Sequence, residues 1–198
     1  MKPAAGLSVL TIGHSTHPVD RFIELLQSCD VNALADVRSN PFSRFNPQYN
    51  RAALSQALHE AGIAYVFVGK ELGARSEDAS CYENGQVQFS RLSKTALFVA
   101  GIDRIIAGAA KFKIALMCAE KEPLDCHRTL LVSRALEARG ISMAHILSDG
   151  SVEPQATTMS RLLDLVGLPQ NDMFKSRPEL VAAACQIRER KVAYTDGA

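Results

Sequence analysis

Residues 113–128 read KIALMCAEKEPLDCHR and contain the clearest strand, loop and helix start in the chain. Lys113–Cys118 is a short, nearly continuous apolar run, which is typical of a strand buried on both faces. A helical pattern, Cys126–Arg139, follows the polar loop. A buried strand followed by a helix is the unit of parallel α/β sheets, and ligands bind where such strands end. We therefore expect this loop to carry part of a functional site.

Four further β-rich runs alternate with helical patterns along the chain. They are Ser8–Gly13, Ala33–Val37, Ala64–Val68 and Ser142–Leu147. Alternating strands and helices predict right-handed crossover connections and an α/β fold. Five strands are too few for a closed eight-stranded barrel, so we predict an open, mostly parallel five-stranded sheet with helices on both faces.

The helical segments divide the chain into two parts. Arg91–Ala110 has a long helical pattern with an expected break near Gly101, and two shorter patterns lie in the C-terminal part. We expect residues 1–150 to form the α/β domain. Residues 151–198 should form a C-terminal helical extension that is either packed on the domain or partly mobile.

Composition and charge limit the class of protein. The 198 residues include 22% charged side chains and carry a formal net charge of +1. This near-neutral balance argues against a dedicated nucleic-acid binder, which is usually strongly basic. Five cysteines without a regular short spacing do not suit the framework of a disulfide-rich secreted domain. Since no run approaches the ~18 apolar residues of a membrane span, we expect a cytoplasmic protein without a membrane segment.

Polar side chains follow the predicted strands at the points where they end. Because the carboxyl ends of parallel strands meet at one edge of the sheet, these side chains are expected to form one site. Asp36 or Glu120 would act there as an acid or base, with His14 as a further catalytic candidate. The plainer alternative is that Asp36 and Arg38 form an ion pair that fixes the next loop. The polar residues at or near these ends are His14, Ser15, Asp36, Arg38, Lys70, Arg75, Cys118, Glu120, Ser148 and Asp149.

The helix after the loop has an expected N-cap at Asp125, which places Cys126, His127 and Arg128 in its first turn. The unpaired N–H groups and the positive dipole end would attract an anion there and lower the pKa of a thiol. Arg128 would add a bidentate donor suited to phosphate or carboxylate. Cys126 is therefore a catalytic candidate, and His127 and Arg128 are ligand-binding candidates.

The two cysteines leave several chemical interpretations open. An oxyanion-cradling cysteine loop would need an arginine six residues after Cys118, but Leu124 stands there and two glutamates lie between, so this interpretation fails. A nucleophilic cysteine would need a histidine as base. Consecutive helical residues point about 100° apart, so we expect Cys126 and His127 not to touch, and a pairing with His14 is easier.

A zinc site is a further interpretation of the same residues. Cys118, Cys126 and His127 are acceptable ligand types, and a tetrahedral site would take a fourth ligand such as His14 or His145. The spacing matches no known zinc finger or ribbon. His145 lies inside an apolar strand, where a hydrogen-bonded core histidine is the plainer interpretation.

The loop after the second predicted strand offers a different surface. Phe42, Arg44, Phe45 and Arg51 combine aromatic rings with positive charge, which suits stacking and neutralisation of a nucleic-acid strand. The plainer interpretation is that the two phenylalanines anchor this loop to the body of the protein. A nucleic-acid partner through these four residues is therefore kept as an alternative.

Several short motifs together resemble one family. They are Thr11–Ser15, Asp36–Arg38, Asn40–Arg44, Leu72–Gly73, Leu116–Glu120 and Cys126–Arg128. Their order and spacing, from about residue 8 to residue 147, are similar to the family called domain of unknown function 488. The resemblance implies a small cytoplasmic α/β protein with one site at the strand ends, and no particular activity. Its motif residues in this chain are His14, Ser15, Asp36, Arg38, Ser43, Arg44, Cys118, Glu120, Cys126, His127 and Arg128.

The sequence thus predicts an enzyme or ligand-binding domain whose polar pocket takes a small phosphorylated or otherwise anionic ligand, including a nucleotide. The alternatives are a non-catalytic module that binds nucleic acid or protein, and a metal-dependent hydrolase that uses the cysteines and histidine. No phosphate loop or nucleophile elbow selects a reaction, a cofactor or an oligomeric state. The catalytic candidates are His14, Asp36, Glu120 and Cys126. The ligand-binding candidates are Ser15, Arg38, Ser43, Arg44, Cys118, His127 and Arg128.

Overall fold

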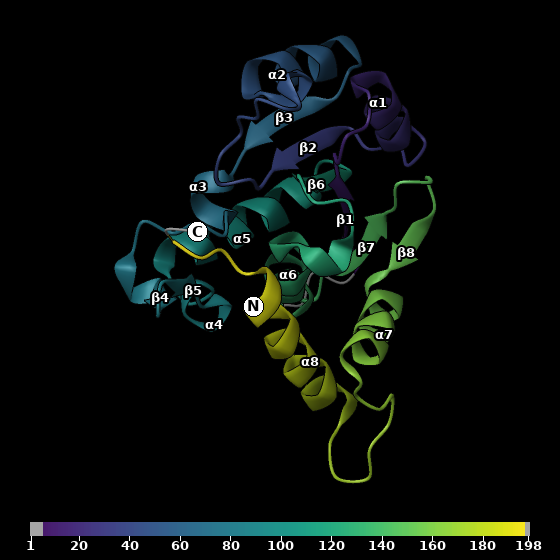
Figure 1. Ribbon diagram of the computed structural model, residues 1–198. Coiled ribbons are helices and arrows are strands. Elements are labelled where there is room, and N and C mark those ends of the chain that lie inside the picture. Colours follow the sequence, from purple (N-terminus) through teal and green to yellow (C-terminus); the bar gives the residue numbers. More distant parts are fainter. Residues whose placement is uncertain (1–5, 197–198) are drawn as a thin grey trace.

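The computed structural model of the protein describes residues 6–196, and its centre is a six-stranded sheet (Figure 1). The strands of this sheet are β1 (Ser8–Gly13), β2 (Ala33–Asp36), β3 (Ala64–Phe67), β6 (Ile114–Cys118), β7 (Ser142–Ile146) and β8 (Val152–Pro154). Their order is β3-β2-β6-β1-β7-β8, and every neighbouring pair is parallel except β7 and β8. The central strands β1 and β6 pair Gly13 with Cys118, so both end at the same edge.

Helices cover both faces of the sheet (Figure 1). Alternate residues of β6 explain how: Ala115 and Met117 face one apolar cluster, whereas Ile114 and Leu116 face the other. The first cluster is completed by the two helices that lie between β1 and β3 in sequence, and the second by the remaining helices. A strand buried on both faces must be apolar throughout, as the sequence of β6 is. The helices are α1 (Val19–Gln27), α2 (Arg51–Glu60), α3 (Gly69–Leu72), α4 (Phe89–Leu92), α5 (Ala96–Ala109), α6 (Arg134–Glu137), α7 (Gln155–Val166) and α8 (Arg177–Val192). A π-helical segment, Arg128–Ser133, leads directly into α6.

The structure confirms the predicted α/β class and the open, mostly parallel sheet, with one strand more than expected. The additional strand, β8, pairs antiparallel with β7 through Ala144 and Pro154. A strand of three residues that ends in proline has no hydrophobic alternation to reveal it.

The expected break near Gly101 is wrong. Helix α5 runs without interruption through Gly101, and the break lies earlier, between α4 and α5, where the Thr95 hydroxyl caps the N–H of Phe98 at 3.2 Å. Gly101 instead allows a close helix–helix contact, because an added Cβ would lie 2.6 Å from the Cβ of Glu71. The glycine thus reflects packing of α5 on α3 rather than a helix end.

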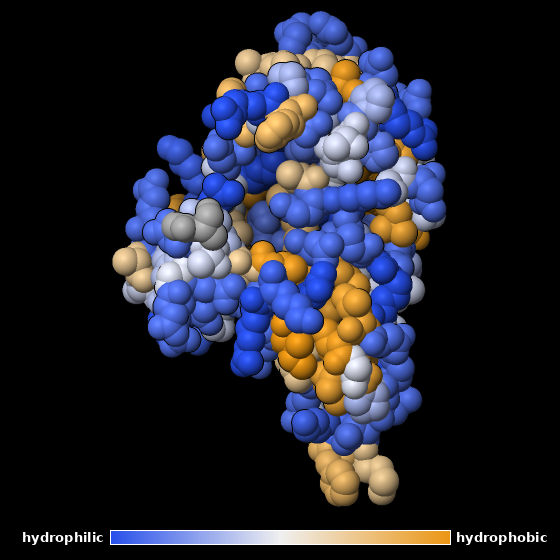
Figure 2. Space-filling view, viewed as in Figure 1, coloured by the Kyte–Doolittle hydropathy of each residue, from blue (hydrophilic) through white to orange (hydrophobic). Residues whose placement is uncertain are grey.

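The C-terminal segment returns to the body of the protein. Strands β4 (Tyr82–Glu83) and β5 (Gln86–Val87) form a small hairpin. The residues after α8 pack against this hairpin, and the N–H of Val87 donates to the carbonyl of Tyr194 at 3.0 Å. The loop between α7 and α8 extends away from the body, and apolar side chains are visible at its tip (Figure 2); Met173 and Phe174 there are more than nine-tenths exposed. None of the helices in residues 6–196 is long and apolar enough to cross a membrane.

Candidate functional site

The loops after β1 and β6 lie side by side at the carboxyl edge of the sheet. The N–H of His14 donates to the carbonyl of Cys118 at 2.9 Å, and that of Ser15 to Ala119 at 3.0 Å, so pairing continues beyond the strands. The contact is too close for a side chain at Gly13, where a Cβ would lie 1.9 Å from the carbonyl oxygen of Glu120. Two of the predicted strand ends are therefore joined as expected.

A buried ion pair occupies the end of β2. The guanidinium of Arg38 donates to both carboxylate oxygens of Asp36, from Nε at 2.9 Å and from Nη2 at 2.7 Å. The hydroxyl of Tyr65 adds a donor to Asp36 at 2.8 Å, and Arg38 Nη2 also donates to the carbonyl of Tyr49 at 2.8 Å. The carboxylate of Asp36 is thus saturated and fully buried. These contacts give Asp36 the task of positioning Arg38 and lend no support to its predicted acid–base role.

His14 supports the same arginine. Its Nδ1 donates to the carbonyl of Ser15 at 2.8 Å, which leaves Nε2 to accept from Arg38 Nη1 at 3.3 Å. The ring stacks on Tyr49 with a centroid distance of 4.1 Å. Burial, together with the charge of Arg38, lowers the pKa of His14 to about 4. His14 is therefore neutral at pH 7, and both ring nitrogens are engaged.

Two thiols and an imidazole converge at the end of β6. His127 Nδ1 lies 3.7 Å from Cys118 Sγ and 3.8 Å from Cys126 Sγ, and the three atoms lie within 4.8 Å of one another. His127 Nε2 lies 3.1 Å from the carbonyl oxygen of Val37, which fixes the ring. We call Cys118, Cys126 and His127 the thiol–imidazole cluster.

The expected separation of Cys126 and His127 is wrong, and so is the expected N-cap at Asp125. Pro123 starts a short 3₁₀ turn, and Cys126 then adopts an extended backbone with φ −133° and ψ 139°. The carbonyl of Cys126 accepts the first helical hydrogen bond from Leu130, and its Sγ accepts the N–H of Arg128 at 3.4 Å. Cys126 is therefore the capping residue itself, and its extended backbone turns the thiol toward His127.

The cluster strongly perturbs the ionisation of its members. The neighbouring Cys126 sulfur and burial hold the pKa of the Cys118 thiol well above its usual value. Burial opposes ionisation of Cys126, but Cys118, Arg128 and His127 outweigh it and hold the pKa of Cys126 well below its usual value. Despite burial, Cys126 raises the pKa of His127. Burial and Cys126 also raise the pKa of Glu120, whose carboxylate lies 2.9 Å from Cys126 Sγ.

Arg128 lies behind the cluster and not on its open side. Its guanidinium is fully buried and donates to the carbonyl of Glu120 at 2.7 Å and to that of Lys121 at 3.2 Å. Nε lies 3.4 Å from the hydroxyl oxygen of Thr11. The arginine predicted to bind an anion thus donates its hydrogen bonds to carbonyls of the loop that follows β6.

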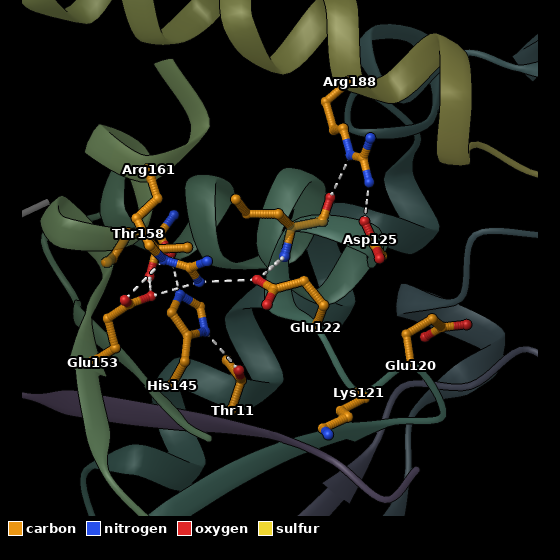
Figure 3. Close-up of polar contacts among 12 residues, drawn as sticks. Thr11, Glu120, Lys121, Glu122, Asp125, His145, Glu153, Thr158, Arg161 and Arg188 are labelled. Carbon is orange, nitrogen blue, oxygen red and sulfur yellow. Dashed lines mark hydrogen bonds and ion pairs between the residues drawn. The ribbon is translucent and has the colours of Figure 1, made fainter. Parts of the chain in front are cut away.

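The C-terminal helices hold the same loop from outside (Figure 3). Arg188 of α8 donates to the carbonyl of Leu124 at 3.1 Å and forms an ion pair with Asp125. Arg161 of α7 forms ion pairs with Glu122 of the loop and with Glu153 of β8, each at 2.9 Å. This anchoring by residues beyond position 150 was outside what sequence reasoning predicted, because the contacts join segments about 40 to 60 residues apart.

Two cavities meet at Arg38. One has a volume of about 230 Å³ and the other about 460 Å³, and both are lined by Arg38, Asn40, Arg75 and Ala119. We call the combined hollow the carboxyl-edge cleft. The smaller cavity is also lined by Ser39, Cys118, Glu120, Asp125, His127 and Tyr194. The larger cavity is also lined by His14, Ser15, Thr16, Phe42, Ser43 and Asn46.

The remaining candidates lie at the margin of the cleft. The hydroxyl of Ser43 accepts the N–H of Asn46 at 3.1 Å within its own loop. Phe42 and Phe45 are 61% and 91% exposed, so the interpretation that both rings anchor the loop to the body is wrong. Arg44 is exposed, and Arg51 stacks over the ring of Phe67, 4.9 Å from its centroid. The alternative nucleic-acid residues thus form no single stacked group.

Other predicted ligands lie apart from the cluster. His145, a suggested fourth zinc ligand, is buried between the hydroxyl of Thr11 at 2.7 Å and Gln155 at 2.5 Å. Burial lowers the pKa of His145 to about 4. Conversely, Arg75 was expected at the carboxyl edge but was not named as a catalytic or ligand-binding residue, although it lines both cavities and follows the Leu72–Gly73 motif. Its place shortly after the third strand was the signal that pointed to it.

The fold and the site define an α/β protein with an arginine-lined cleft and a thiol–imidazole cluster at the carboxyl edge of its sheet. A family model described as domain of unknown function DUF488 matches residues 18–135, which is more than half of the 198 residues. The chain belongs to this family. His14, Ser15 and the His145 region lie outside the matched range, so their part in the family pattern stays a prediction. No curated protein and no solved structure matches the chain.

Proposed function

We propose that the protein binds a small anionic ligand, bearing phosphate or carboxylate, in the carboxyl-edge cleft. The observation that carries this proposal is the position of Arg38, a buried arginine with a fixed orientation that lines both cavities. A guanidinium N–H forms strong, charge-assisted hydrogen bonds with phosphate or carboxylate oxygens. The ligand class remains the one predicted from the sequence, but the residues proposed to bind it are partly different.

The hydrogen bonds of Arg38 leave it one donor for a ligand. A guanidinium has five N–H groups. Asp36 takes two of them, Tyr49 one and His14 one, so a single N–H of Nη1 is left over. Because the partners hold the side chain in place before a ligand arrives, binding costs little ordering of Arg38.

Arg75 supplies the second positive charge. Its guanidinium stacks over the ring of Tyr194, with Cζ 4.4 Å from the centroid, and no ion pair joins Arg75 to a carboxylate in residues 6–196. The charge of Arg38 is offset by Asp36, whereas that of Arg75 is not. Arg75 is therefore proposed to give most of the electrostatic attraction, and Arg38 the orientation.

Reactive groups line the smaller cavity beside these arginines. Cys118, His127 and Glu120 all contribute to its wall. Among the predicted carboxylates, Glu120 stands at the cavity wall while Asp36 is saturated, so we assign the acid–base role to Glu120. Ser15 and Ser43 line the larger cavity and keep their proposed ligand-binding role.

Isothermal titration with inorganic phosphate, pyrophosphate and a nucleoside monophosphate tests this proposal. Arg75→Ala should weaken binding by about 10- to 100-fold, since a hydrogen bond to a charged group contributes about 1.5–3 kcal/mol. Arg104→Ala is the matched control, because Arg104 is also an exposed arginine but pairs with Glu71 on the surface. Equal affinities of the two variants, or no binding of any of the three anions to the unmodified protein, would contradict the proposal.

A nucleic-acid strand is a second candidate ligand. Phe42 and Phe45 are exposed large rings on the loop beside the cleft, and Arg44 lies between them in sequence. Exposed rings stack on bases, and positive charge neutralises phosphates. Titration of a labelled single-stranded oligonucleotide should then give an affinity that falls steeply with salt and is lowered in Phe45→Ser. No binding at low salt removes this candidate.

We also propose a reducing, cytoplasmic location. All five cysteines are free, including the two neighbouring thiols of the cluster. Thiols persist in reducing compartments, whereas oxidising ones favour disulfides. Alkylation at the moment of cell lysis should therefore label all five cysteines after unfolding, and a Cys118–Cys126 disulfide would oppose this location.

A further inference from the structure

The spacing of the thiol–imidazole cluster matches that of a metal centre. A tetrahedral zinc ion with Zn–S bonds of about 2.3 Å and a Zn–N bond of about 2.0–2.1 Å holds sulfur and nitrogen about 3.6 Å apart. His127 Nδ1 lies 3.7 Å from Cys118 Sγ and 3.8 Å from Cys126 Sγ. Both nitrogen–sulfur distances are therefore within a few tenths of an ångström of those in a zinc site, and the two sulfur atoms lie within 4.8 Å of each other.

The orientation of His127 supports the same conclusion. Nε2 lies 3.1 Å from the carbonyl oxygen of Val37, a hydrogen bond in which Nε2 must carry the proton. The neutral ring then has its lone pair on Nδ1, and both sulfur atoms face that single lone pair. A single cation bound by that lone pair satisfies the imidazole and two thiolates together. A carbonyl partner for the second nitrogen is also the usual support of a metal-binding histidine.

We propose that Cys118, Cys126 and His127 bind one zinc-class divalent metal ion, with a fourth coordination position open to the smaller cavity. Two sulfurs and one imidazole select zinc or a similar soft metal over magnesium or calcium. Cys118 and His127 line the cavity while Cys126 lies behind them, so the fourth position faces the cavity. Three protein ligands and one open position are typical of catalytic zinc.

Binding of the ion replaces protons and rearranges one hydrogen bond. Each thiol that still carries a proton releases it to solvent as its sulfur binds the ion. The hydrogen bond that joins Cys126 Sγ and the Glu120 carboxyl group at 2.9 Å is then broken, and Glu120 still lines the cavity that the open position faces. An anion held by Arg38 and Arg75 in the same cavity could reach the ion, but the three ligands form the metal site whether or not that anion binds.

Metal content and cobalt substitution test the site. Protein purified under reducing conditions without chelator should contain about one equivalent of zinc-class metal by mass spectrometry. The chelated protein should bind Co²⁺ with the thiolate-to-cobalt charge-transfer band of a four-coordinate site. Cys126→Ser and His127→Asn should lose the metal and the band. Cys29→Ser, which removes a thiol outside the cluster, should keep both.

Alkylation of the unmodified protein gives a second readout that does not depend on the folding of variants. With the metal bound, Cys118 and Cys126 should resist iodoacetamide, and chelation should speed their alkylation at least tenfold, as mapped by peptide mass spectrometry. Cys29 should react at the same rate in both states. The proposal is overturned if the reduced protein binds neither Zn²⁺ nor Co²⁺. It is also overturned if chelation leaves the two rates unchanged, or if folded Cys126→Ser or His127→Asn retains the metal.

Discussion

Replacing Arg128 by alanine separates its structural role from the anion-binding role predicted from the sequence. The guanidinium is fully buried and holds the carbonyls of Glu120 and Lys121 at 2.7 and 3.2 Å. Arg128→Ala removes both hydrogen bonds and leaves the space of a large side chain behind. We therefore expect a loss of stability even without any ligand.

The expected magnitude follows from the two charge-assisted hydrogen bonds. At about 1.5–3 kcal/mol each, their loss would amount to about 3–6 kcal/mol. Both carbonyls are only partly buried, so water can enter and restore part of their hydrogen bonding, which favours the lower end. We expect a decrease of about 3 kcal/mol in the free energy of unfolding. With a urea m-value of about 2 kcal/mol per M, the unfolding midpoint should fall by about 1.5 M.

Urea unfolding followed by circular dichroism measures this shift, with Arg104→Ala as control. Arg104 forms an ion pair with Glu71 on the surface, so its removal should cost no more than about 1 kcal/mol. If Arg128→Ala unfolds at the same urea concentration as the control, the structural role of Arg128 is wrong. Such a result would return Arg128 to the group of anion ligands.

Three further predictions concern other contacts near the site. Gly13→Ala should destabilise the protein by about 1–3 kcal/mol because the new Cβ would lie 1.9 Å from the carbonyl oxygen of Glu120, and an unchanged urea midpoint would show that the loop yields freely. Burial lowers the pKa of His145 to about 4, below the value of about 6.5 in the unfolded chain. The folded state therefore binds fewer protons, so the stability contributed by neutral His145 is complete above pH 6.5 and is lost as the pH falls toward 4, by up to about 3 kcal/mol. His145→Gln should flatten the pH dependence of the urea midpoint in this range, and an equally steep decline in the variant would oppose the assignment. Tyr65→Phe removes the hydroxyl that donates to Asp36 at 2.8 Å and should cost about 1 kcal/mol in the same assay, whereas a neutral result would indicate that water replaces it.

The fold was largely readable because its strands are short β-rich runs between helical patterns. Burial of β6 on both faces requires apolar residues at every position, and this makes the strand visible in the sequence. Strand β8 lacked such a signal. The start of the helix that follows β6 was missed by one residue, because Pro123 starts a 3₁₀ turn that ends before Cys126 and makes Cys126, not Asp125, the capping residue.

The site was harder to predict than the fold. Sequence placed the polar residues at one edge, but it could not tell whether an arginine faces the cleft or the loop behind it. Arg38 and Arg128 are both buried, yet only Arg38 lines the cavities, and the difference arises from contacts with Asp36 and with two loop carbonyls. Arg188 and Tyr194 reach the site from the C-terminal segment, and no local sequence pattern predicts such long-range contacts.

The central claim is that the carboxyl-edge cleft binds an anion between Arg38 and Arg75. Crystals soaked in selenate, a phosphate-like oxyanion, test it most directly through anomalous diffraction at the selenium absorption edge. We expect an anomalous peak inside the cleft, with selenate oxygens within hydrogen-bonding distance of the Arg38 and Arg75 guanidinium groups, and no such peak in Arg75→Ala crystals. An empty cleft in the unmodified protein, or a peak that persists in Arg75→Ala, would contradict the claim.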